Sequence, residues 1–190
     1  MPTSFAHTIL DTTRLQLRPL QESDAATIYA LRSHSEVTRY VGYTTWTSID
    51  LAHELIAKDI RAMALGEYVR FGLVRREDGA LIGTCLLYDL DIQCRRAEIG
   101  YDLHPDQWGR GYIHEALLAL LAFGYSVVGL NRIEADVDPD NAASIKTLER
   151  LGFQREGYLR ERWIVNGVKF DTVYYGLLLS EWESRNSLRP

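Results

Sequence analysis

The chain of 190 residues has little cysteine and no metal-ligand pattern. Its two cysteines, Cys85 and Cys94, are far from any C-x-x-C spacing. Two isolated thiols give no disulfide framework, so we expect a reducing compartment. His, Cys and Asp are not grouped at ligand spacing, so the sequence gives no support for a bound metal. A Gly-x-Ser-x-Gly elbow is also missing, which argues against a serine acyl-enzyme.

Long apolar runs and basic runs are absent as well. No stretch reaches 18 uninterrupted apolar residues, and Met1 to Leu10 lacks a charged segment followed by an apolar one. We therefore expect no membrane span and a cytoplasmic location. Lys and Arg number 21 against 26 Asp and Glu, a formal net charge of −5, and the basic residues form no run. A nucleic-acid partner is not expected, because proteins that bind the phosphate backbone concentrate positive charge on one face.

What the chain has is enough apolar residues for one core. Hydrophobic residues make up 46% of it, and no repeat, low-complexity tract or linker interrupts it. At roughly 150 residues per domain, the length predicts one domain spanning residues 1–190. A chain of this size buries well over half of its unfolded surface without staples.

The hydrophobic pattern alternates between strand and helix periods. It predicts strands over Arg14–Arg18, Val69–Val74, Leu81–Tyr88, Arg96–Leu103, Arg132–Val137, Arg162–Val165 and Val168–Leu178. It predicts helices from Ser23 through Leu31, from Ser48 or Asp50 to Gly66, over Glu115–Phe123, and from an Asn141 cap to a Gly152 stop. Asp78-Gly79 and Asn166-Gly167 favour tight hairpins. The fold class is therefore α+β, a single mixed and mostly antiparallel sheet with helices on both faces.

A glycine-spaced turn lies between one predicted strand and the buried helix. Gly109 and Gly111 allow close approach of a ligand to the backbone, and a helix start presents unpaired N–H groups that suit phosphate oxygens. The same spacing also occurs in an ordinary tight turn. It is neither a Walker loop nor a G-x-G-x-x-G fingerprint, because position 114 is His.

Several short blocks follow one another along the chain. They are Glu98-Ile99-Gly100-Tyr101, Trp108-Gly109-Arg110-Gly111-Tyr112, Glu115-Ala116, Asn131-Arg132-Ile133-Glu134, Asn141-Ala142-Ala143-Ser144 and Leu151-Gly152-Phe153. Together they resemble the GNAT superfamily of acetyl-CoA-dependent N-acetyltransferases, in its RimJ/RimL-like branch, which includes ribosomal-protein N-terminal acetyltransferases. The resemblance runs from Thr13 to Trp182 and implies a GNAT-like domain, acetyl-CoA as co-substrate and no metal.

The resemblance also implies where acetyl-CoA binds. The donor residues it names are Ile99, Gly100, Tyr101, Trp108, Gly109, Arg110, Gly111, Tyr112, Ile113 and Asn141. The glycine turn would hold the pyrophosphate, and the acyl group would lie between two diverging strands. Two positions depart from the family pattern: Ile113 stands where Gly or Ala is usual, and His114 replaces a small hydroxyl residue.

Amine acetylation requires a base, because an ammonium has no lone pair. Glu98 lies on the strand face opposite its apolar neighbours and matches the strand glutamate that serves as base in several superfamily members. The alternative is a structural ion pair with Arg95, Arg96 or a neighbouring strand. Asp102, on the same face, is a reserve base or a selector of a cationic substrate.

The departing CoA thiolate requires a proton. Many superfamily members supply it from a tyrosine at the position that Leu148 occupies here, so the resemblance transfers the role to Ser144. Asn141 could equally be a helix cap and Ser144 a capping-turn hydroxyl.

Two further groups are open to two interpretations. Arg160, Asp171 and Tyr174 match branch positions, but are equally cross-strand partners in the last hairpin. Tyr40, Tyr43 and Trp46 could line the acceptor site or join the core.

The resemblance predicts acetyl transfer to a primary amine, by direct attack in a ternary complex. A protein N-terminal amine is the expected acceptor. The alternatives are a small amine such as an antibiotic, polyamine or amino-acid derivative, and a non-catalytic acyl-CoA-binding module. A homodimer is left open.

Overall fold

The computed structural model describes residues 4–40 and 44–187. Its strands are β1 (Leu10–Asp11), β2 (Leu15–Arg18), β3 (Val69–Arg75), β4 (Leu81–Asp91), β5 (Arg96–Leu103), β6 (Arg132–Val137), β7 (Gln154–Val165) and β8 (Val168–Leu178). The described strands form one sheet in the order β1-β2-β3-β4-β5-β6-β8-β7. Neighbours are antiparallel except β5 and β6, which are parallel. The predicted mixed, mostly antiparallel sheet is confirmed.

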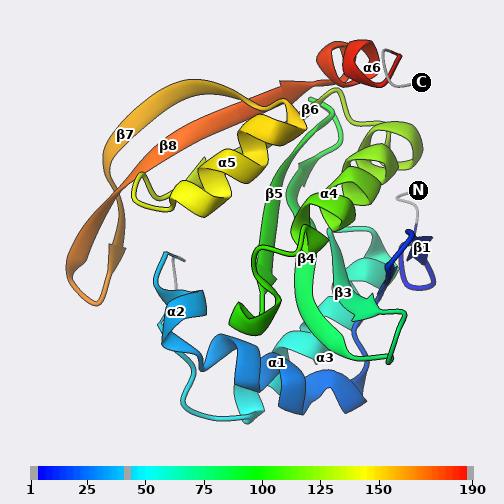
Figure 1. Cartoon of the computed structure of the whole chain (residues 1–190), viewed down its shortest axis with the longest axis vertical. Coiled ribbons are helices and arrows are strands. Elements are labelled where there is room, and N and C mark those ends of the chain that lie inside the picture. Colours follow the sequence, from blue (N-terminus) through cyan, green and yellow to red (C-terminus); the bar gives the residue numbers. More distant parts are fainter. Residues whose placement is uncertain (1–3, 41–43, 188–190) are drawn as a thin grey trace.

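Helices cover both faces of this sheet (Figure 1). They are α1 (Ala25–Arg32), α2 (Ser35–Thr38), α3 (Asp50–Leu65), α4 (Tyr112–Phe123), α5 (Ala142–Leu151) and α6 (Leu179–Ser187), with 3-10 turns at Glu22–Asp24 and Pro105–Gln107 and a π turn at Gly124–Val128. α4 lies over the main core, while α1 and α3 enclose a smaller cluster on the opposite face. None of the described helices is long and apolar enough to cross a membrane.

The main core follows the alternation in the sequence. Ile133, Ala135 and Val137 of β6 are buried, as their spacing predicts. One face of α4 is buried too, with Leu117 and Leu120 fully inaccessible, while Ile113, Leu118 and Ala119 are partly exposed. Burial of these side chains fixes which face of each strand looks toward α4 and which looks toward α1 and α3.

The strands β5 and β6 separate in the middle of the sheet. Their pairing covers Ala97 with Ile133 and ends at Glu98 with Glu134. β5 nevertheless stays paired with β4 as far as Leu103, and β6 stays paired with β8 as far as Val137. The sheet therefore opens between β5 and β6 from residue 99 onward.

Several predicted boundaries are wrong. β7 begins at Gln154 instead of Arg162, because its first half is exposed and interrupted by register shifts, which hide the alternation. Ser23 is not a helix cap. It lies inside a 3-10 turn capped reciprocally by Gln21 and Asp24. The helices α2 and α6 and the π turn are not predicted by the sequence pattern.

The predicted hairpins and helix stops are confirmed. Gly79 and Gly167 have φ of +72° and +79°, in the left-handed region that favours glycine. The stops at Gly66 and Gly152 are also left-handed, with φ of 71° and 104°. Figure 1 shows the β7–β8 hairpin curving toward the segment around α2, where Thr44 Oγ1 donates to Asn166 Oδ1 at 3.4 Å.

Candidate active site

The glycine turn forms the N-terminus of α4. Gly109 and Gly111 have φ of +72° and +78°, which only glycine adopts without strain. Gly111 is the N-cap residue and supplies no side chain to the first helical N–H groups. Those N–H groups, at the positive end of the helix dipole, can donate to an anion. A methyl group at Gly109 would meet no atom within 4 Å, so the backbone is open to a ligand there.

Arg14, at the start of β2, fixes this turn from outside. Its Nη1 donates to the carbonyl of Arg110 at 2.9 Å, and its Nε donates to Glu115 Oε2 at 2.6 Å. The guanidinium also lies 4.6 Å from the ring centre of Tyr112. Burial raises the pKa of Glu115, but hydrogen bonds from Thr12 and Arg14 outweigh it and lower the pKa overall. The sequence gives no signal for this contact, because its partners lie about a hundred residues apart.

A cleft of about 420 Å³ begins at the turn and runs beside α5; we call it the turn cleft. The predicted donor residues that line it are Tyr101, Trp108, Gly109, Gly111, Tyr112, Ile113 and Asn141. His114 lines it as well. Arg110 is exposed and contributes its carbonyl to Arg14 instead. Ile99 and Gly100 lie in the next cavity.

A second cavity, also of about 420 Å³, extends beneath the β7–β8 hairpin; we call it the hairpin cavity. Residues from α1, the segment after α2, β3 to β8 and α5 line it, among them Arg32, Arg70, Tyr88, Asp136, Trp163 and Asp171. The two cavities share Tyr40, Tyr101, Asp102, Asn141 and Ser144. They therefore meet where β5 and β6 separate.

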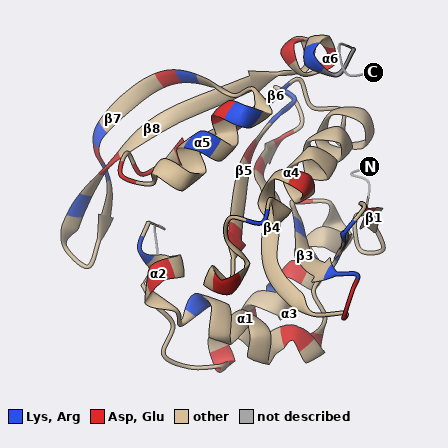
Figure 2. Ribbon diagram, in the orientation of Figure 1, with Lys and Arg blue, Asp and Glu red and all other residues tan. Residues whose placement is uncertain are grey.

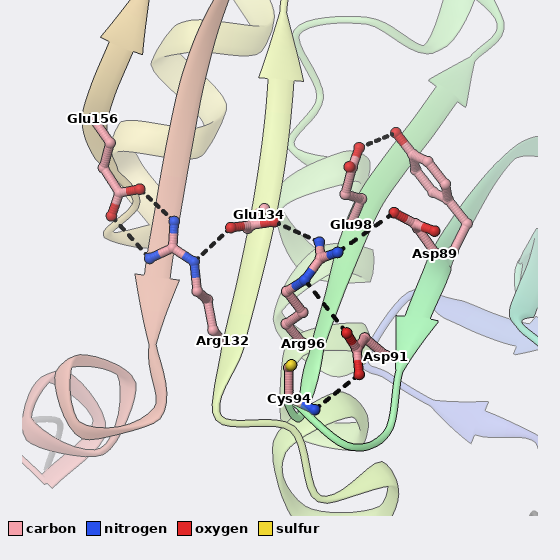
Figure 3. A network of polar contacts seen from close by, with 9 residues as sticks. Asp89, Asp91, Cys94, Arg96, Glu98, Arg132, Glu134 and Glu156 are labelled. Atoms are coloured by element: carbon pink, nitrogen blue, oxygen red, sulfur yellow. Dashed lines mark hydrogen bonds and ion pairs between the residues drawn. The ribbon is translucent and has the colours of Figure 1, made fainter.

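Glu98 is half-buried in β5, behind a wall of the hairpin cavity. Its Oε2 accepts a hydrogen bond from the hydroxyl of Tyr88, which lines that cavity, at 2.9 Å. Burial raises the pKa of Glu98; the Tyr88 hydrogen bond opposes the shift and the charge of Asp136 adds to it. Arg96 pairs with Glu134 at 3.0 Å and with two aspartates of β4, not with Glu98 (Figure 3). The alternative of an Arg96 ion pair is wrong.

Ser144 lies in the first turn of α5, directly opposite β5. Its Oγ is 2.6 Å from the hydroxyl of Tyr101, and its N–H donates to Asn141 Oδ1 at 3.1 Å. Asn141 is thus the predicted cap of α5. Burial raises the pKa of Tyr101 to about 12, so the hydroxyl remains protonated at neutral pH. Leu148, one turn further on, is fully buried.

Both carboxylate oxygens of Asp102 already have partners in the protein. Its Oδ1 accepts from the N–H and Oγ1 of Thr84 at 2.9 and 2.7 Å, and its Oδ2 is 3.3 Å from Arg32. Its side chain is 8% exposed. These contacts leave it poorly suited to either predicted role, as a reserve base or as a selector of cations.

The other predicted residues divide between cavity and scaffold. Asp171 accepts from the backbone N–H of Glu161 at 2.7 Å and from Tyr158, which supports the cross-strand interpretation. Tyr40 lines both cavities. Trp46 packs against the smaller core.

Two of the predicted residues, Arg160 and Tyr174, do not line either cavity, and a third is not described. Tyr43 lies outside the described residues. Arg160 is exposed on β7. Tyr174 pairs in register with Asp136 of β6. Within the described parts of the chain, no group of three His, Cys, Asp or Glu side chains is placed to hold a metal ion.

The family comparison agrees with this geometry. A family model described as an acetyltransferase (GNAT) domain matches residues 14–154. The "Uncharacterized N-acetyltransferase YoaA" of Bacillus subtilis is 39% identical over 170 residues, which cover 90% of this chain and 96% of that protein.

Two more distant similarities extend over most of the chain. The spermidine N(1)-acetyltransferase of Vibrio cholerae is 26% identical, over 91% of this chain and 98% of that protein. The solved structure of Mycobacterium smegmatis RimJ in complex with CoA-disulfide superposes with a TM-score of 0.83 at 24% identity, over 92% of this chain and 88% of that one. The similarity to RimJ concerns the fold alone.

Proposed function

Because this chain belongs to the GNAT family and is an acetyl-CoA-dependent N-acetyltransferase, we propose that its acceptor is a primary amine, the N-terminal amine of a protein or peptide, bound in the hairpin cavity. The observation that carries the proposal is the shared wall of the two cavities at Tyr101, Asn141 and Ser144. A donor in one cavity and an acceptor in the other would meet there. Direct attack in a ternary complex requires such a meeting point.

The turn cleft suits the CoA part of the donor. Its open backbone at Gly109 and the uncapped helix start at Gly111 present N–H donors for pyrophosphate oxygens. Arg14 holds the turn in place and adds a positive charge beside it. The acyl group would extend to the edge of β5 that β6 leaves open. A backbone N–H there, from Tyr101, would polarise the acetyl carbonyl.

Glu98 would receive the proton that the amine loses. Its raised pKa brings it closer to working pH than an ordinary glutamate, and Tyr88 connects it to the cavity. The amine then forms the C–N bond, and the C–S bond to CoA breaks. Ser144 Oγ would protonate the departing thiolate and regain a proton from Tyr101, its neighbour at 2.6 Å. Solvent would then return a proton to Tyr101 and take the amine proton from Glu98.

A screen for thiol release tests the proposal. Acetyl-CoA is incubated with the enzyme and with peptides bearing free or blocked N-termini, polyamines, amino acids and aminoglycosides. We expect saturable thiol release with free N-termini and none with blocked ones. Release only with polyamines or aminoglycosides would contradict the acceptor. Acetyl-CoA binding without release on any amine would instead support the non-catalytic module.

A further inference from the structure

Arg70 of β3 is a buried cation in the wall of the hairpin cavity. It is 8% exposed. Its Nε lies 3.0 Å from Asp59 Oδ2, within ion-pair distance but without hydrogen-bond geometry. Its Nη1 is buried and has no hydrogen-bond partner among the described residues. A buried donor left without an acceptor costs about 1–3 kcal/mol, so an anion in this cavity would find an unused donor.

The carboxylates in the same cavity are all engaged already. Asp102 accepts from Thr84, Asp136 accepts from Trp163 at 2.9 Å, Asp138 accepts from the N–H of Asp140, and Asp171 accepts from the N–H of Glu161. Each carboxylate therefore has a protein donor, whereas Arg70 keeps a free N–H. This asymmetry favours an acceptor that carries an anion over one with several cationic groups, such as a polyamine.

Apart from Asp102, which pairs with Arg32, the carboxylates and the arginines of the cavity come from different elements. The arginines of the cavity are Arg32 of α1, Arg39 directly after α2, and Arg70 of β3. Figure 2 shows basic positions on α1 and on the segment that follows α2. Asp136, Asp138 and Asp171 come from β6, its following turn and β8. An amine directed at the gap between β5 and β6 therefore lies beside carboxylates, with the arginines on other elements of the cavity.

The strand register sets the distance between Arg70 and the point where β5 and β6 separate. Arg70 pairs with Leu86 of β4, which pairs with Gly100 of β5, just past the point where β6 departs. Two strand spacings separate Arg70 from Gly100, about 10 Å. Since an extended chain spans about 3.3–3.6 Å per residue, this distance corresponds to no more than about three residues.

We propose that Arg70 forms an anion subsite of the hairpin cavity, and that the acceptor carries a carboxylate within about 10 Å of its reacting amine. The inference rests on the proposed function and specifies its substrate. Such a carboxylate can be the C-terminus of a dipeptide, for which a free amino acid is the smallest probe, or an acidic side chain near a peptide N-terminus. Arg39, an exposed residue that also lines the cavity, adds another positive charge.

Matched acids and amides test the subsite. Rates of thiol release are measured for alanine and dialanine against their C-terminal amides, and for glutamyl-alanyl-alanine amide against its glutaminyl counterpart. We expect kcat/KM to favour the carboxylate member of at least one pair by about tenfold or more. The first two pairs report a free C-terminus and the third reports an acidic side chain. Equal rates within all three pairs would overturn the proposal.

Variants of the buried Arg70–Asp59 pair test whether Arg70 causes the preference for acids over amides. Arg70→Gln alone leaves Asp59 as an unpaired buried charge, so the informative variant is Arg70→Gln with Asp59→Asn, which removes both charges. It should lose the acid preference while keeping the amide rate and the KM for acetyl-CoA. Asp59→Asn alone keeps the cation and should keep the preference, as should Arg61→Gln on the exposed side of α3. Survival of the preference in the double variant would overturn the proposal.

A binding measurement separates this proposal from the proposed function. The melting temperature is measured with CoA present and either N-acetylalanine or N-acetylalanine amide added. If no amine is turned over but the acid stabilises the protein through Arg70, the proposed function fails and the subsite stands. If amines are turned over but the acid gives no more stabilisation than the amide and no acid preference, the subsite fails alone.

Discussion

Burial is the main influence on the carboxylates of Glu98 and Asp136, and the charge of Arg162 offsets it only in part at Asp136. Burial raises the pKa of both, and the charge of Asp136 further raises that of Glu98. Their protonated forms are therefore favoured in the folded state. The stability that this contributes is full at low pH and is lost as pH rises through the raised pKa values. The base form of Glu98 accumulates over the same range, so activity should rise as stability falls.

Glu98→Gln should lower kcat about a hundredfold or more at pH 7, because a general base contributes about 10²–10⁴. The KM for acetyl-CoA should not change. The melting temperature at pH 7 should stay level or rise, since a half-buried charge is removed while an acceptor for Tyr88 remains. The loss of rate should shrink at high pH, where neutral amine is abundant.

Asp89→Asn is the matched control for that experiment. Asp89 is an exposed carboxylate of β4 near Glu98, and the Asp89→Asn variant should retain the wild-type rate. A wild-type rate for Glu98→Gln at pH 7 would assign Glu98 to the scaffold.

Ser144→Ala should lower kcat about ten- to a hundredfold, at the low end of general acid catalysis, because a thiolate is already a fair leaving group. KM for both substrates should change little. Ser144→Thr keeps the hydroxyl and should restore most of the rate. If Ser144→Ala turns over normally while Tyr174→Phe does not, the proton comes from the last hairpin.

At the scale of elements, β2 and α4 together make the donor turn. Arg14 joins them, and Gly111 lies under its guanidinium, so that a Cβ at Gly111 would come 3.5 Å from Nη2. A Cβ there would strain the left-handed backbone and would touch Arg14 at ordinary van der Waals distance.

Gly111→Val should raise the Kd for acetyl-CoA about tenfold or more, because the new side chain obstructs the N–H groups at the start of α4. Gly79→Val is the matched control: its φ of +72° imposes similar strain, and a Cβ there meets nothing within 4 Å. Calorimetry should show wild-type affinity for the Gly79 variant. Equal affinities for both variants would place the pyrophosphate elsewhere.

The sequence predicts the elements that carry a clear period. β6 and β8 have the predicted bounds, and Asn141 caps α5 as expected, because alternation and capping are local properties. β7 is missed in its first half because backbone pairing with β8 holds it while its side chains face solvent. A pattern of burial cannot reveal a strand that is mostly exposed.

The site is predictable only in part from the sequence. Family blocks place Glu98, Ser144 and the glycine turn near one another. They do not show the Tyr101–Ser144 contact, the Arg14 clamp or Arg70. Each of these depends on pairs of residues distant in sequence, which a single chain does not specify.

The whole molecule places two cavities on the two sides of one opening in the sheet. The parallel pair β5–β6 ends at Glu98 and Glu134, and the β7–β8 hairpin closes one cavity while α4 and α5 border the other. Donor and acceptor would thus enter separately and react at a shared wall. Such an arrangement requires no covalent acetyl-enzyme.

Initial rates over a matrix of acetyl-CoA and acceptor concentrations test direct transfer in a ternary complex most directly. Direct transfer predicts double-reciprocal lines that intersect, because both substrates must be bound before either product leaves. Parallel lines, together with an acetyl group recovered on the enzyme after incubation with acetyl-CoA alone, would contradict it. The measurement is repeated with Cys94→Ser, since Cys94 is the exposed thiol, and intersecting lines are expected for both proteins.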